Sequence, residues 1–337
     1  MRLIEKVWFQ RHPAKWLFVP LLMPLTLLFG VLTTLRRMFY KFGFFTSYRV
    51  NKPVVVVGNI GIGGNGKTPF VLYLIEQCIK QGIKPGVISR GYGGQAPHYP
   101  YLLDQTSTAV EAGDEPLLIY NRSAVPVVVG SDRIASAELL IEQGCDVIIA
   151  DDGLQHYRLI RDIELIIIDG NRRFGNGLLL PAGPLREGLW RLKSVGYVIN
   201  NSGLTPLKDE ITMSLHPKVI VNLLTNEQVL LEVFRKKNPA VNAIAGIGDP
   251  QRFFNTLTTH QFSLAKTQGF IDHHNYQLAD FNGYDEDMAL LMTEKDGVKC
   301  QQFAKSHWWY VPVDAQFNEQ QIQPLLADIM QLIKDKI

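Results

Sequence analysis

One octapeptide constrains this chain more than any other feature of its sequence. Residues 61–68 read Gly-Ile-Gly-Gly-Asn-Gly-Lys-Thr and satisfy the G-x-x-x-x-G-K-[ST] pattern of a phosphate-binding P-loop at every position. Val54 to Val57 before it form a β-branched run typical of a strand buried on both faces of a parallel sheet, and Phe70 to Lys80 after it has helical character. This order of strand, loop and helix predicts an α/β domain that binds a nucleoside triphosphate.

The residue types of the loop fit phosphate chemistry. Glycines allow backbone N–H groups to turn toward phosphate oxygens, and the dipole of the following helix favours negative charge there. Lys67 is expected to reach the β and γ phosphates, and Thr68 to ligand Mg²⁺. We therefore expect the nucleotide to be bound by Gly61, Ile62, Gly63, Gly64, Asn65, Gly66, Lys67 and Thr68.

A P-loop also needs a carboxylate near the metal, normally at the end of a neighbouring strand. Asp151 and Asp152 follow the apolar run Val147 to Ala150 and precede a glycine, so two acids emerge where the sheet should meet the phosphates. The doubled acid favours metal binding over a solvated turn. Asp169-Gly170, which has a single acid after a similar run, is interpreted as a solvated turn at a strand end.

Further apolar runs alternate with helix-compatible segments and predict a doubly wound α/β domain. The runs are Val125 to Val129, Val147 to Ala150, Leu165 to Ile168 and Tyr197 to Asn200. From about Val219 the pattern restarts with shorter units, and Asn, Ser, Gly and Pro cluster between residues 201 and 218. We expect a P-loop core domain over residues 46–210 and a smaller α/β domain over residues 211–337. In the second domain, Asp249 suits the N-cap and Pro250 the first position of a helix.

The first 45 residues differ from the rest and predict a membrane anchor. Trp16 to Leu35 has no charged side chain, and about 20 apolar residues suffice to cross the hydrocarbon core of a bilayer. A cleaved signal peptide would need small residues after this run, where Arg36 and Arg37 stand instead. A buried core helix is the other alternative, and aromatic residues flanking the run favour the membrane. The pattern leaves open whether the segment spans the bilayer or only inserts into it.

Composition excludes several other classes of protein. Lys and Arg total 34 against 32 for Asp and Glu, a formal net charge of +2, so no basic face for nucleic acid is indicated. The three cysteines, Cys78, Cys145 and Cys300, are far apart and lack C-x-x-C spacing. This argues against a disulfide framework or a zinc site and favours a reducing compartment.

Phosphoryl transfer requires positive charge and a group that accepts or orients the attacking hydroxyl, so charged residues in turn-rich segments are candidates. They lie in Ser89-Arg90-Gly91-Tyr92, Gly113-Asp114-Glu115-Pro116, Ser131-Asp132-Arg133, Pro184-Leu185-Arg186-Glu187 and Asp272-His273-His274. An arginine can bind phosphate through two N–H groups, and a His beside an Asp can serve as a general base. Taken singly, the segments are better explained as turns, N-caps, loop dipeptides or surface ion pairs.

Taken together, and in chain order, the motifs resemble those of the tetraacyldisaccharide 4′-kinase family. They are Gly58-Asn59 before the P-loop, Ser89-Arg90-Gly91-Tyr92, Gly113-Asp114-Glu115-Pro116, Asp151-Asp152-Gly153-Leu154-Gln155, Pro184-Leu185-Arg186-Glu187, Asp272-His273-His274 and Thr293-Glu294-Lys295-Asp296. The resemblance implies transfer of the γ-phosphate of ATP to the 4′-hydroxyl of tetraacyldisaccharide 1-phosphate, which forms lipid IV-A in lipid A synthesis. It also implies two α/β domains joined by a strand-containing hinge, and work at the cytoplasmic face of the bacterial inner membrane, with no oligomer required.

The same resemblance implies roles for individual residues. Asp114 would be the catalytic base, oriented or aided by His273. The other roles are phosphate and Mg²⁺ binding by Lys67, Thr68, Asp151 and Asp152, positive charge from Arg90, Arg133 and Arg186, and part of the nucleotide site from Tyr92 and Glu187. An acyl-chained acceptor leaves a bilayer with difficulty, since each exposed methylene costs about 0.8 kcal/mol, and this gives the apolar N-terminus a purpose.

The main alternative is a membrane-associated P-loop NTPase that hydrolyses nucleotide without a lipid acceptor. A guanine-specific switch protein would carry [NT]-K-x-D, and Thr293-Glu294-Lys295-Asp296 misses it because the lysine comes one position late. A non-catalytic nucleotide sensor is disfavoured by the intact lysine, threonine and paired acids of the motifs.

Overall fold

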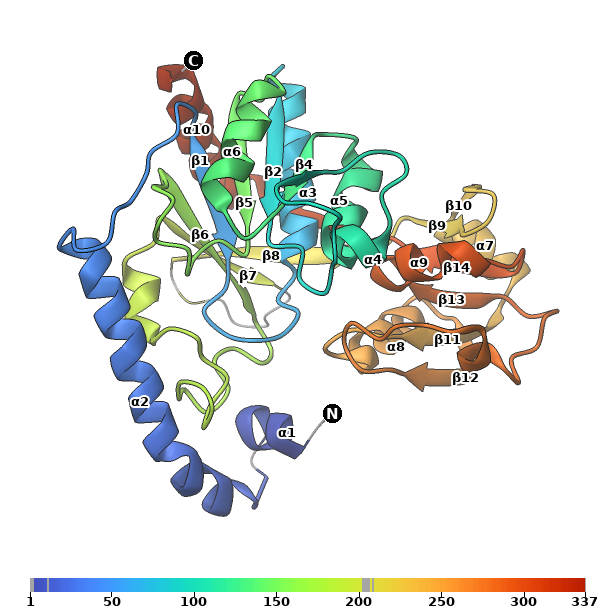
Figure 1. Cartoon of the computed structure of the whole chain (residues 1–337). Coiled ribbons are helices and arrows are strands. Elements are labelled where there is room, and N and C mark those ends of the chain that lie inside the picture. The colour runs from blue at the N-terminus through green and yellow to red at the C-terminus, as the bar shows by residue number, and fades with distance from the viewer. Residues whose placement is uncertain (1–2, 11, 202–206, 208, 337) are drawn as a thin grey trace.

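The molecule has a larger α/β lobe, a smaller α/β lobe and an N-terminal pair of helices that runs beside the larger lobe (Figure 1). The computed structural model describes residues 3–10, 12–201, 207 and 209–336 of the chain. The expected P-loop-containing α/β class with a second, smaller α/β unit is confirmed.

The larger lobe is built on a single twisted sheet, of nine strands within the described residues, in the order β15-β8-β7-β6-β1-β5-β2-β4-β3. The strands are parallel except for β3 and β15, which pair antiparallel at the two edges. Their bounds are β1 (Val54–Gly58), β2 (Pro85–Ser89), β3 (Tyr101–Leu102), β4 (Val127–Val129), β5 (Val147–Asp151), β6 (Ile163–Asp169), β7 (Tyr197–Asn201), β8 (Glu210–His216) and β15 (Asp314–Phe317). Strand β1 lies between β5 and β6, at the centre of the sheet.

Helices cover both faces of this sheet and explain the continuous apolar run before the P-loop. Val55 and Val57 pack into the core beneath α3 (Lys67–Lys80), α5 (Asp114–Ser123) and α10 (Glu319–Lys336). Val54 and Val56 pack into the opposite core, beneath α6 (Arg133–Glu142) and the segments that follow β5 and β6. All four valines are at most 2% exposed, as expected for a central parallel strand. Two shorter helices, α4 (Ala109–Ala112) and the 3₁₀ helix η1 (Leu189–Lys193), lie in the connections.

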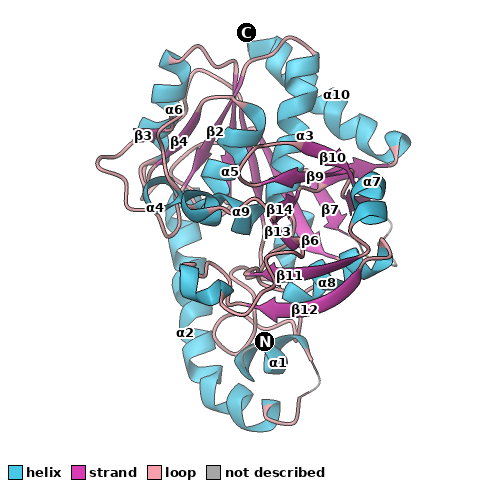
Figure 2. Ribbon diagram, turned by 90° about the vertical axis from the view of Figure 1, so that its right-hand side faces the viewer, coloured by secondary structure: helices cyan, strands magenta, loops and turns pink. Residues whose placement is uncertain are grey.

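The smaller lobe has its own sheet, in the order β10-β9-β14-β13-β11-β12 (Figure 2). Its strands are β9 (Val219–Asn222), β10 (Gln228–Leu230), β11 (Ala240–Ala245), β12 (Ser263–Gly269), β13 (Leu290–Thr293) and β14 (Trp308–Val311). Its helices are α7 (Leu231–Lys237), α8 (Pro250–Thr259), α9 (Glu294–Cys300), η2 (Leu278–Phe281) and η3 (Gln301–Phe303).

We expected the boundary between the two domains to lie between residues 210 and 211, and the observed sheets divide the chain differently. Strands β8 and β15, together with α10, belong to the larger lobe, so the chain crosses between the lobes twice. The reason is long-range pairing, since Met213 faces Phe317 across β8 and β15 while Leu325 and Ile329 of α10 are buried in the larger core. Part of the expected boundary, residues 202–206 and 208, lies outside the described residues.

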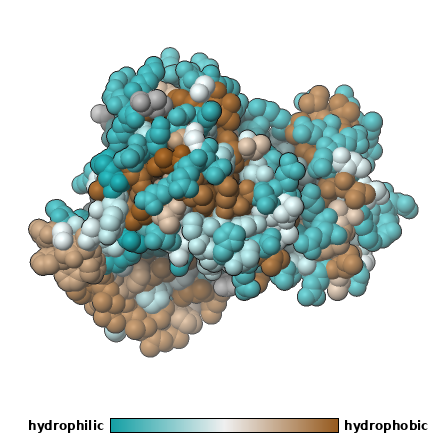
Figure 3. Space-filling model, turned by 45° about the horizontal axis from the view of Figure 1, so that its top comes forward, coloured by the Kyte–Doolittle hydropathy of each residue, from teal (hydrophilic) through white to brown (hydrophobic). Residues whose placement is uncertain are grey.

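The N-terminal segment folds into α1 (Leu3–Phe9) and α2 (Lys15–Lys41). Helix α2 is longer than the uncharged run and continues through Pro20 and Pro24. It is the one helix in the described ranges that is long and apolar enough to cross a membrane. Thr26 is its only buried side chain, and its exposed leucines form the brown patch at the lower left of Figure 3.

Candidate active site

The P-loop leaves the buried strand β1 and enters α3, whose first residue is Lys67. Gly66 precedes the helix with a φ of +91°, and a Cβ there would lie 2.4 Å from the Asn201 amide nitrogen. That amide nitrogen donates a hydrogen bond to the Asn65 carbonyl at 3.0 Å. Only glycine satisfies both the backbone angle and the space at position 66.

The Pro-Leu-Arg-Glu segment supports the P-loop from the side. The Ile62 N–H donates to the Pro184 carbonyl at 2.9 Å, and the Arg186 N–H donates to the Ile60 carbonyl at 2.7 Å. These bonds hold residues 60–62 and 184–186 together as a short antiparallel ladder around the bridge between Gly61 and Leu185. The segment therefore fixes the entrance of the P-loop as well as the Arg186 side chain.

The paired acids lie where the sheet meets the P-loop. Asp151 ends β5 and is 1% exposed, and Asp152 follows with a positive φ of +49°. The Lys67 ammonium lies 3.5 Å from Asp152 Oδ1, and the Arg186 guanidinium donates to Asp152 Oδ2 at 2.9 Å. Burial raises the pKa of Asp152, but the charges of Lys67 and Arg186 outweigh it and leave the pKa below its usual value.

Asp151 is the group that fits a metal. Burial, followed by the negative charge of Glu115, raises the pKa of Asp151. Its Oδ1 atom is buried and accepts no hydrogen bond within the described structure, which is costly for a carboxylate. A cation at this oxygen would satisfy it and reverse the pKa shift. No cluster of three or more His, Cys, Asp or Glu that could hold a metal occurs among the described residues, so other ligands would have to come from Thr68, phosphates and water.

A second pair of titratable groups joins the two lobes. Asp114, in the first turn of α5, accepts a hydrogen bond from His273, whose Nδ1 lies 3.0 Å from Asp114 Oδ2. His273 follows β12 of the smaller lobe and is 159 positions away in the sequence. The Asp114 side chain is 6% exposed and that of His273 is 31% exposed. Seen from the solvent, the Asp114 carboxylate therefore lies behind the His273 imidazole.

This arrangement favours the charged form of both partners. Burial raises the pKa of Asp114, but the hydrogen bond from His273 and the charge of Lys295 outweigh it, so the pKa is lowered. The hydrogen bond to Asp114 raises the pKa of His273, against the opposing effects of burial and of Lys295. His273 is thus the stronger proton acceptor of the two and also the more accessible one.

The remaining candidates divide into two groups. Tyr92 packs its ring 5.2 Å from that of His273, and Arg90, two residues earlier, is exposed. Arg133 is buried instead and donates to the Asp151 carbonyl at 3.0 Å, and burial lowers its pKa to about 10. Glu187 is also buried, where it bonds the Tyr157 hydroxyl and the Gln155 amide. Arg133 and Glu187 are therefore buried beneath the site, and their hydrogen bonds hold its other residues in place.

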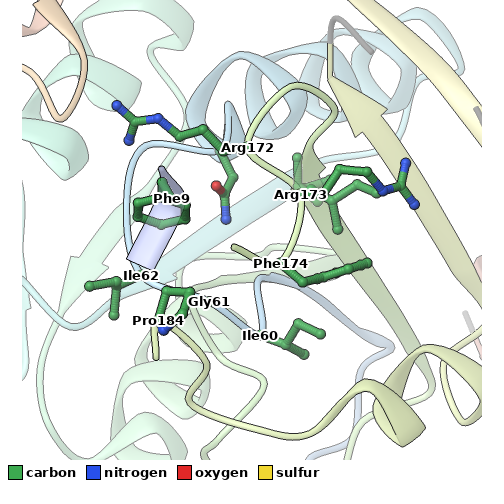
Figure 4. A pocket seen from close by; sticks show the side chains of 11 residues that line it. Phe9, Ile60, Gly61, Ile62, Arg172, Arg173, Phe174 and Pro184 are labelled. Carbon is green, nitrogen blue, oxygen red and sulfur yellow. The ribbon is translucent and has the colours of Figure 1, made fainter. Parts of the chain in front are cut away.

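Arg172 was not singled out in the sequence, yet it lies where three parts of the chain meet. Its guanidinium bonds the Gly248 carbonyl at 3.2 Å and Asp249 at 3.1 Å in the smaller lobe, and it lies over the Phe9 ring of α1. Figure 4 shows Arg172 and Phe9 at the small pocket beside Gly61 and Ile62 of the P-loop.

A second ion pair complements that of Arg172. Asp169 of the larger lobe is 5% exposed and pairs with Arg252 of the smaller lobe at 3.3 Å. The interpretation of Asp169-Gly170 as a solvated turn was therefore wrong. The sequence did carry one signal of a buried, paired acid at this position: Asp169 ends an apolar strand and is followed by Arg172 and Arg173.

Comparisons with known proteins agree in one family. Residues 18–331 match the family model of tetraacyldisaccharide-1-P 4′-kinase. The chain is 60% identical to the tetraacyldisaccharide 4′-kinase of Colwellia psychrerythraea and 50% identical to that of Tolumonas auensis, in each case over 98% of both chains. A crystal structure of LpxK from Aquifex aeolicus in complex with ATP superposes with a TM-score of 0.78 at 26% identity, over 94% of this chain and 99% of that one.

Proposed function

The chain belongs to the tetraacyldisaccharide-1-P 4′-kinase family, and from this premise we propose how its residues carry out the reaction. The enzyme is an ATP-dependent lipid kinase of lipid A biosynthesis. It transfers the γ-phosphate of ATP to the 4′-hydroxyl of tetraacyldisaccharide 1-phosphate and forms lipid IV-A. The observation that carries the assignment of residues is the hydrogen bond from His273 Nδ1 to the Asp114 carboxylate, which brings a proton acceptor of the smaller lobe to the P-loop lobe.

On the donor side, the backbone of residues 61–66 binds the phosphates and Lys67 neutralises the charge that develops during transfer. The ion pairs of Asp152 with Lys67 and Arg186 hold both cations beside the P-loop before ATP arrives. Arg90 is exposed and free to turn toward a phosphate, whereas Arg133 acts through the Asp151 backbone. Glu187 acts through the buried network that fixes residues 184–187.

Thr68 and Asp151 are proposed to hold Mg²⁺, with Asp152 beside them. When bound, the ion supplies charge neutralisation at the β and γ phosphates. Asp151 is the best candidate for the protein ligand at the end of β5, because its buried Oδ1 accepts no hydrogen bond within the described residues, whereas Asp152 is paired with Lys67 and Arg186.

Replacement of Asp151 by asparagine tests this assignment. We expect the Mg²⁺ concentration for half-maximal activity to rise by about tenfold or more, because an amide oxygen carries no charge to offset that of the ion. The KM for the lipid acceptor should change little. Titration of the initial rate with MgCl₂ at saturating ATP measures the effect, and an unchanged Mg²⁺ dependence would remove Asp151 from the metal site.

On the acceptor side, the geometry favours His273 as the base and Asp114 as the group that orients it. Our sequence-based assignment of the base was Asp114, but its side chain is nearly buried and its pKa is lowered, so it is a poor proton acceptor. His273 Nε2 takes the proton of the 4′-hydroxyl, the hydroxyl oxygen bonds to the γ-phosphorus, and the bond from that phosphorus to the β–γ bridging oxygen breaks to release ADP. The Tyr92 ring packs on the imidazole and limits its rotation.

The direct test is transfer of label from γ-labelled ATP to purified tetraacyldisaccharide 1-phosphate, followed by separation of the lipid products. We expect label at the 4′ position of the lipid. Release of labelled inorganic phosphate without labelled lipid would instead support the hydrolase alternative.

The anchor is proposed to insert into the membrane without crossing it. Thr26, midway along α2, accepts the Ala182 N–H at 2.9 Å, and Arg37 stacks on Trp190 at 3.7 Å, so one side of the helix is docked along the larger lobe. Trp8 of α1 donates to the Pro181 carbonyl at 3.1 Å on the same surface. A helix held in this way cannot cross the bilayer without taking the lobe with it. Because ATP is the donor, the enzyme would work at the cytoplasmic face of the inner membrane.

Charged substitutions on the exposed side of α2 test this placement while they preserve the contact of Thr26. Leu21, Leu28 and Leu32 are 66%, 54% and 56% exposed. Their joint replacement by glutamate should lower partitioning onto phospholipid vesicles by about tenfold or more, because charge in the apolar layer is strongly unfavourable. Vesicle flotation measures the bound fraction. Leu230→Glu, at a residue 62% exposed on the smaller lobe, is the matched control. Equal loss in the control, or full binding of the triple variant, would contradict the proposal.

A further inference from the structure

Lys295 lies against the Asp114–His273 pair and has no role in the reaction described so far. Strand β13 ends at Thr293, whose side chain caps α9 by accepting the Asp296 N–H at 3.2 Å. Asp296 is fully buried and accepts the Gly246 N–H at 2.9 Å. These bonds fix the first turn of α9, and with it the backbone from which the Lys295 side chain projects.

The Lys295 ammonium contacts both lobes at once. It lies 2.9 Å from Glu115 Oε1 and 3.8 Å from Asp114 Oδ2, both on α5 of the larger lobe. It also lies 3.2 Å from Asp272 Oδ1 and 3.5 Å from His273 Nε2, on the loop after β12. The side chain is only 15% exposed, so these interactions are weakly screened.

The donors and acceptors in this cluster select one tautomer of His273. An ammonium group has three donors and no acceptor, so the ring nitrogen that faces it, Nε2, must present a lone pair. The Asp114 carboxylate is an acceptor, so Nδ1 must carry the hydrogen. Asp114 therefore fixes the hydrogen on Nδ1, and Lys295 disfavours a second hydrogen on Nε2, which leaves Nε2 able to receive a proton.

We propose that Lys295 is a positioning residue for phosphoryl transfer, whose ammonium keeps His273 Nε2 unprotonated until the acceptor hydroxyl arrives and ties α5 to the loop that carries the imidazole. This inference rests on the proposed function of Asp114 and His273. In this proposal Lys295 contacts the proton-accepting Nε2 atom of His273 and is assigned no bond to the hydroxyl or the phosphate. It acts through His273, first by disfavouring a second positive charge beside it and second by holding the loop against α5.

A purely mechanical role can be distinguished because a second cation joins the same two helices. Arg122 of α5 pairs with Glu294 of α9 at 2.9 Å, next to Lys295 in the sequence, and with Asp314 at 2.5 Å. Arg122 thus links the lobes without contacting the Asp114–His273 pair. Arg122→Met removes a comparable interlobe ion pair and is the matched control for Lys295→Met.

The charged groups around His273 determine the direction of the expected pH effect. Asp114 of α5 and Asp272 of the same loop stabilise the imidazolium, and Lys295 of α9 destabilises it. Glu115 of α5 and Lys299 of α9 act on the neighbouring Lys295 and Asp114, and Tyr92 contributes an aromatic ring. Removal of the Lys295 charge should therefore raise the pKa of His273, so that activity is lost at a higher pH as the solution is acidified.

The experiment is the pH dependence of kcat for the full-length wild-type enzyme and three variants with the lipid acceptor. Lys295→Met should lower kcat by about tenfold or more and move the acid limb upward by about 0.5 to 1 pH unit. Lys295→Arg keeps the charge and should keep the acid limb of the wild-type enzyme. Arg122→Met should leave the acid limb in place. An unmoved limb in Lys295→Met, a moved limb in Lys295→Arg, or an equal shift in Arg122→Met would overturn the inference.

Titration of His273 by ¹⁵N nuclear magnetic resonance provides a readout that needs no acceptor, with the signal assigned by its loss in His273→Gln. The wild-type ring should show a hydrogen-free Nε2 at neutral pH, and its pKa should rise in Lys295→Met. If Lys295→Met does not fold, Lys295→Arg decides, because a charge-preserving variant with a shifted His273 titration contradicts the inference. A failure of lipid labelling would refute the proposed function and leave this titration unaffected.

Discussion

Lys67→Met should lower kcat for lipid phosphorylation by about 10³-fold, the cost typical of removing a cation or donor aimed at transition-state charge. Lys67 is the first residue of α3, and its ammonium is held 3.5 Å from Asp152 beside the P-loop. In the proposed arrangement the acceptor binds beside His273, so the KM for lipid should change little. Initial rates of label transfer from γ-labelled ATP, at saturating lipid, measure the effect.

Lys80→Met is the matched control for this prediction. Lys80 ends the same helix, where it is exposed and pairs with Glu76 one turn earlier at 2.8 Å. Loss of such a surface pair is worth little, so the control should retain nearly full activity. If Lys67→Met kept activity within tenfold of the wild-type enzyme, the donor half of the proposed site would have to be placed elsewhere.

Local sequence predicted the strand, loop and helix around residues 61–68 because the determinants of these elements are local. The alternate burial of Val54 to Val57 on two faces of one strand is encoded in four consecutive β-branched residues. The left-handed backbone at Gly66 and the helix that begins at Lys67 follow from the same octapeptide. The paired acids after β5 could be placed beside the loop because parallel strands end at the same edge of a sheet.

The division into lobes was less predictable because it depends on pairing between distant segments. Residues 314–317 return to pair with β8 about a hundred positions earlier, and α10 then covers the first core. Neither fact changes the local pattern of the segment, which reads as an ordinary strand and an amphipathic helix. The clustering of turn residues near position 210 therefore indicated a crossing point but not the return crossing.

Individual polar residues were hardest to interpret, since the sequence does not show their partners. Asp249 was expected to cap α8, and it does occupy the N-cap position, but its side chain makes no capping bond and pairs with Arg172 of the other lobe. Asp169 resembled a solvated turn and is buried against Arg252, 83 positions away. Only the resemblance to a family predicted that Asp114 and His273 act together, because the residues around each of them do not indicate the other as a partner.

The second large effect is expected at the Asp114–His273 pair. Asp114→Ala should lower kcat by about 10³-fold, because general base catalysis contributes roughly that much and an imidazole without its carboxylate loses both orientation and basicity. ATP should still bind, since neither side chain contacts the P-loop residues in the structure described. Transfer assays give the rate, and equilibrium titration with a fluorescent ATP analogue gives the affinity.

The double variant decides whether the two residues act as one unit. If His273 takes the proton and Asp114 only orients it, Asp114→Ala should cost almost nothing more once His273→Gln is present. If each residue contributed separately, the two losses would multiply. His274→Gln is the matched control, because His274 is the neighbouring histidine and has its own carboxylate, Asp280, at 2.9 Å. Multiplicative losses at Asp114 and His273, or an equal loss at His274, would show that the hydrogen bond between the lobes is structural and that the acceptor proton leaves by another route.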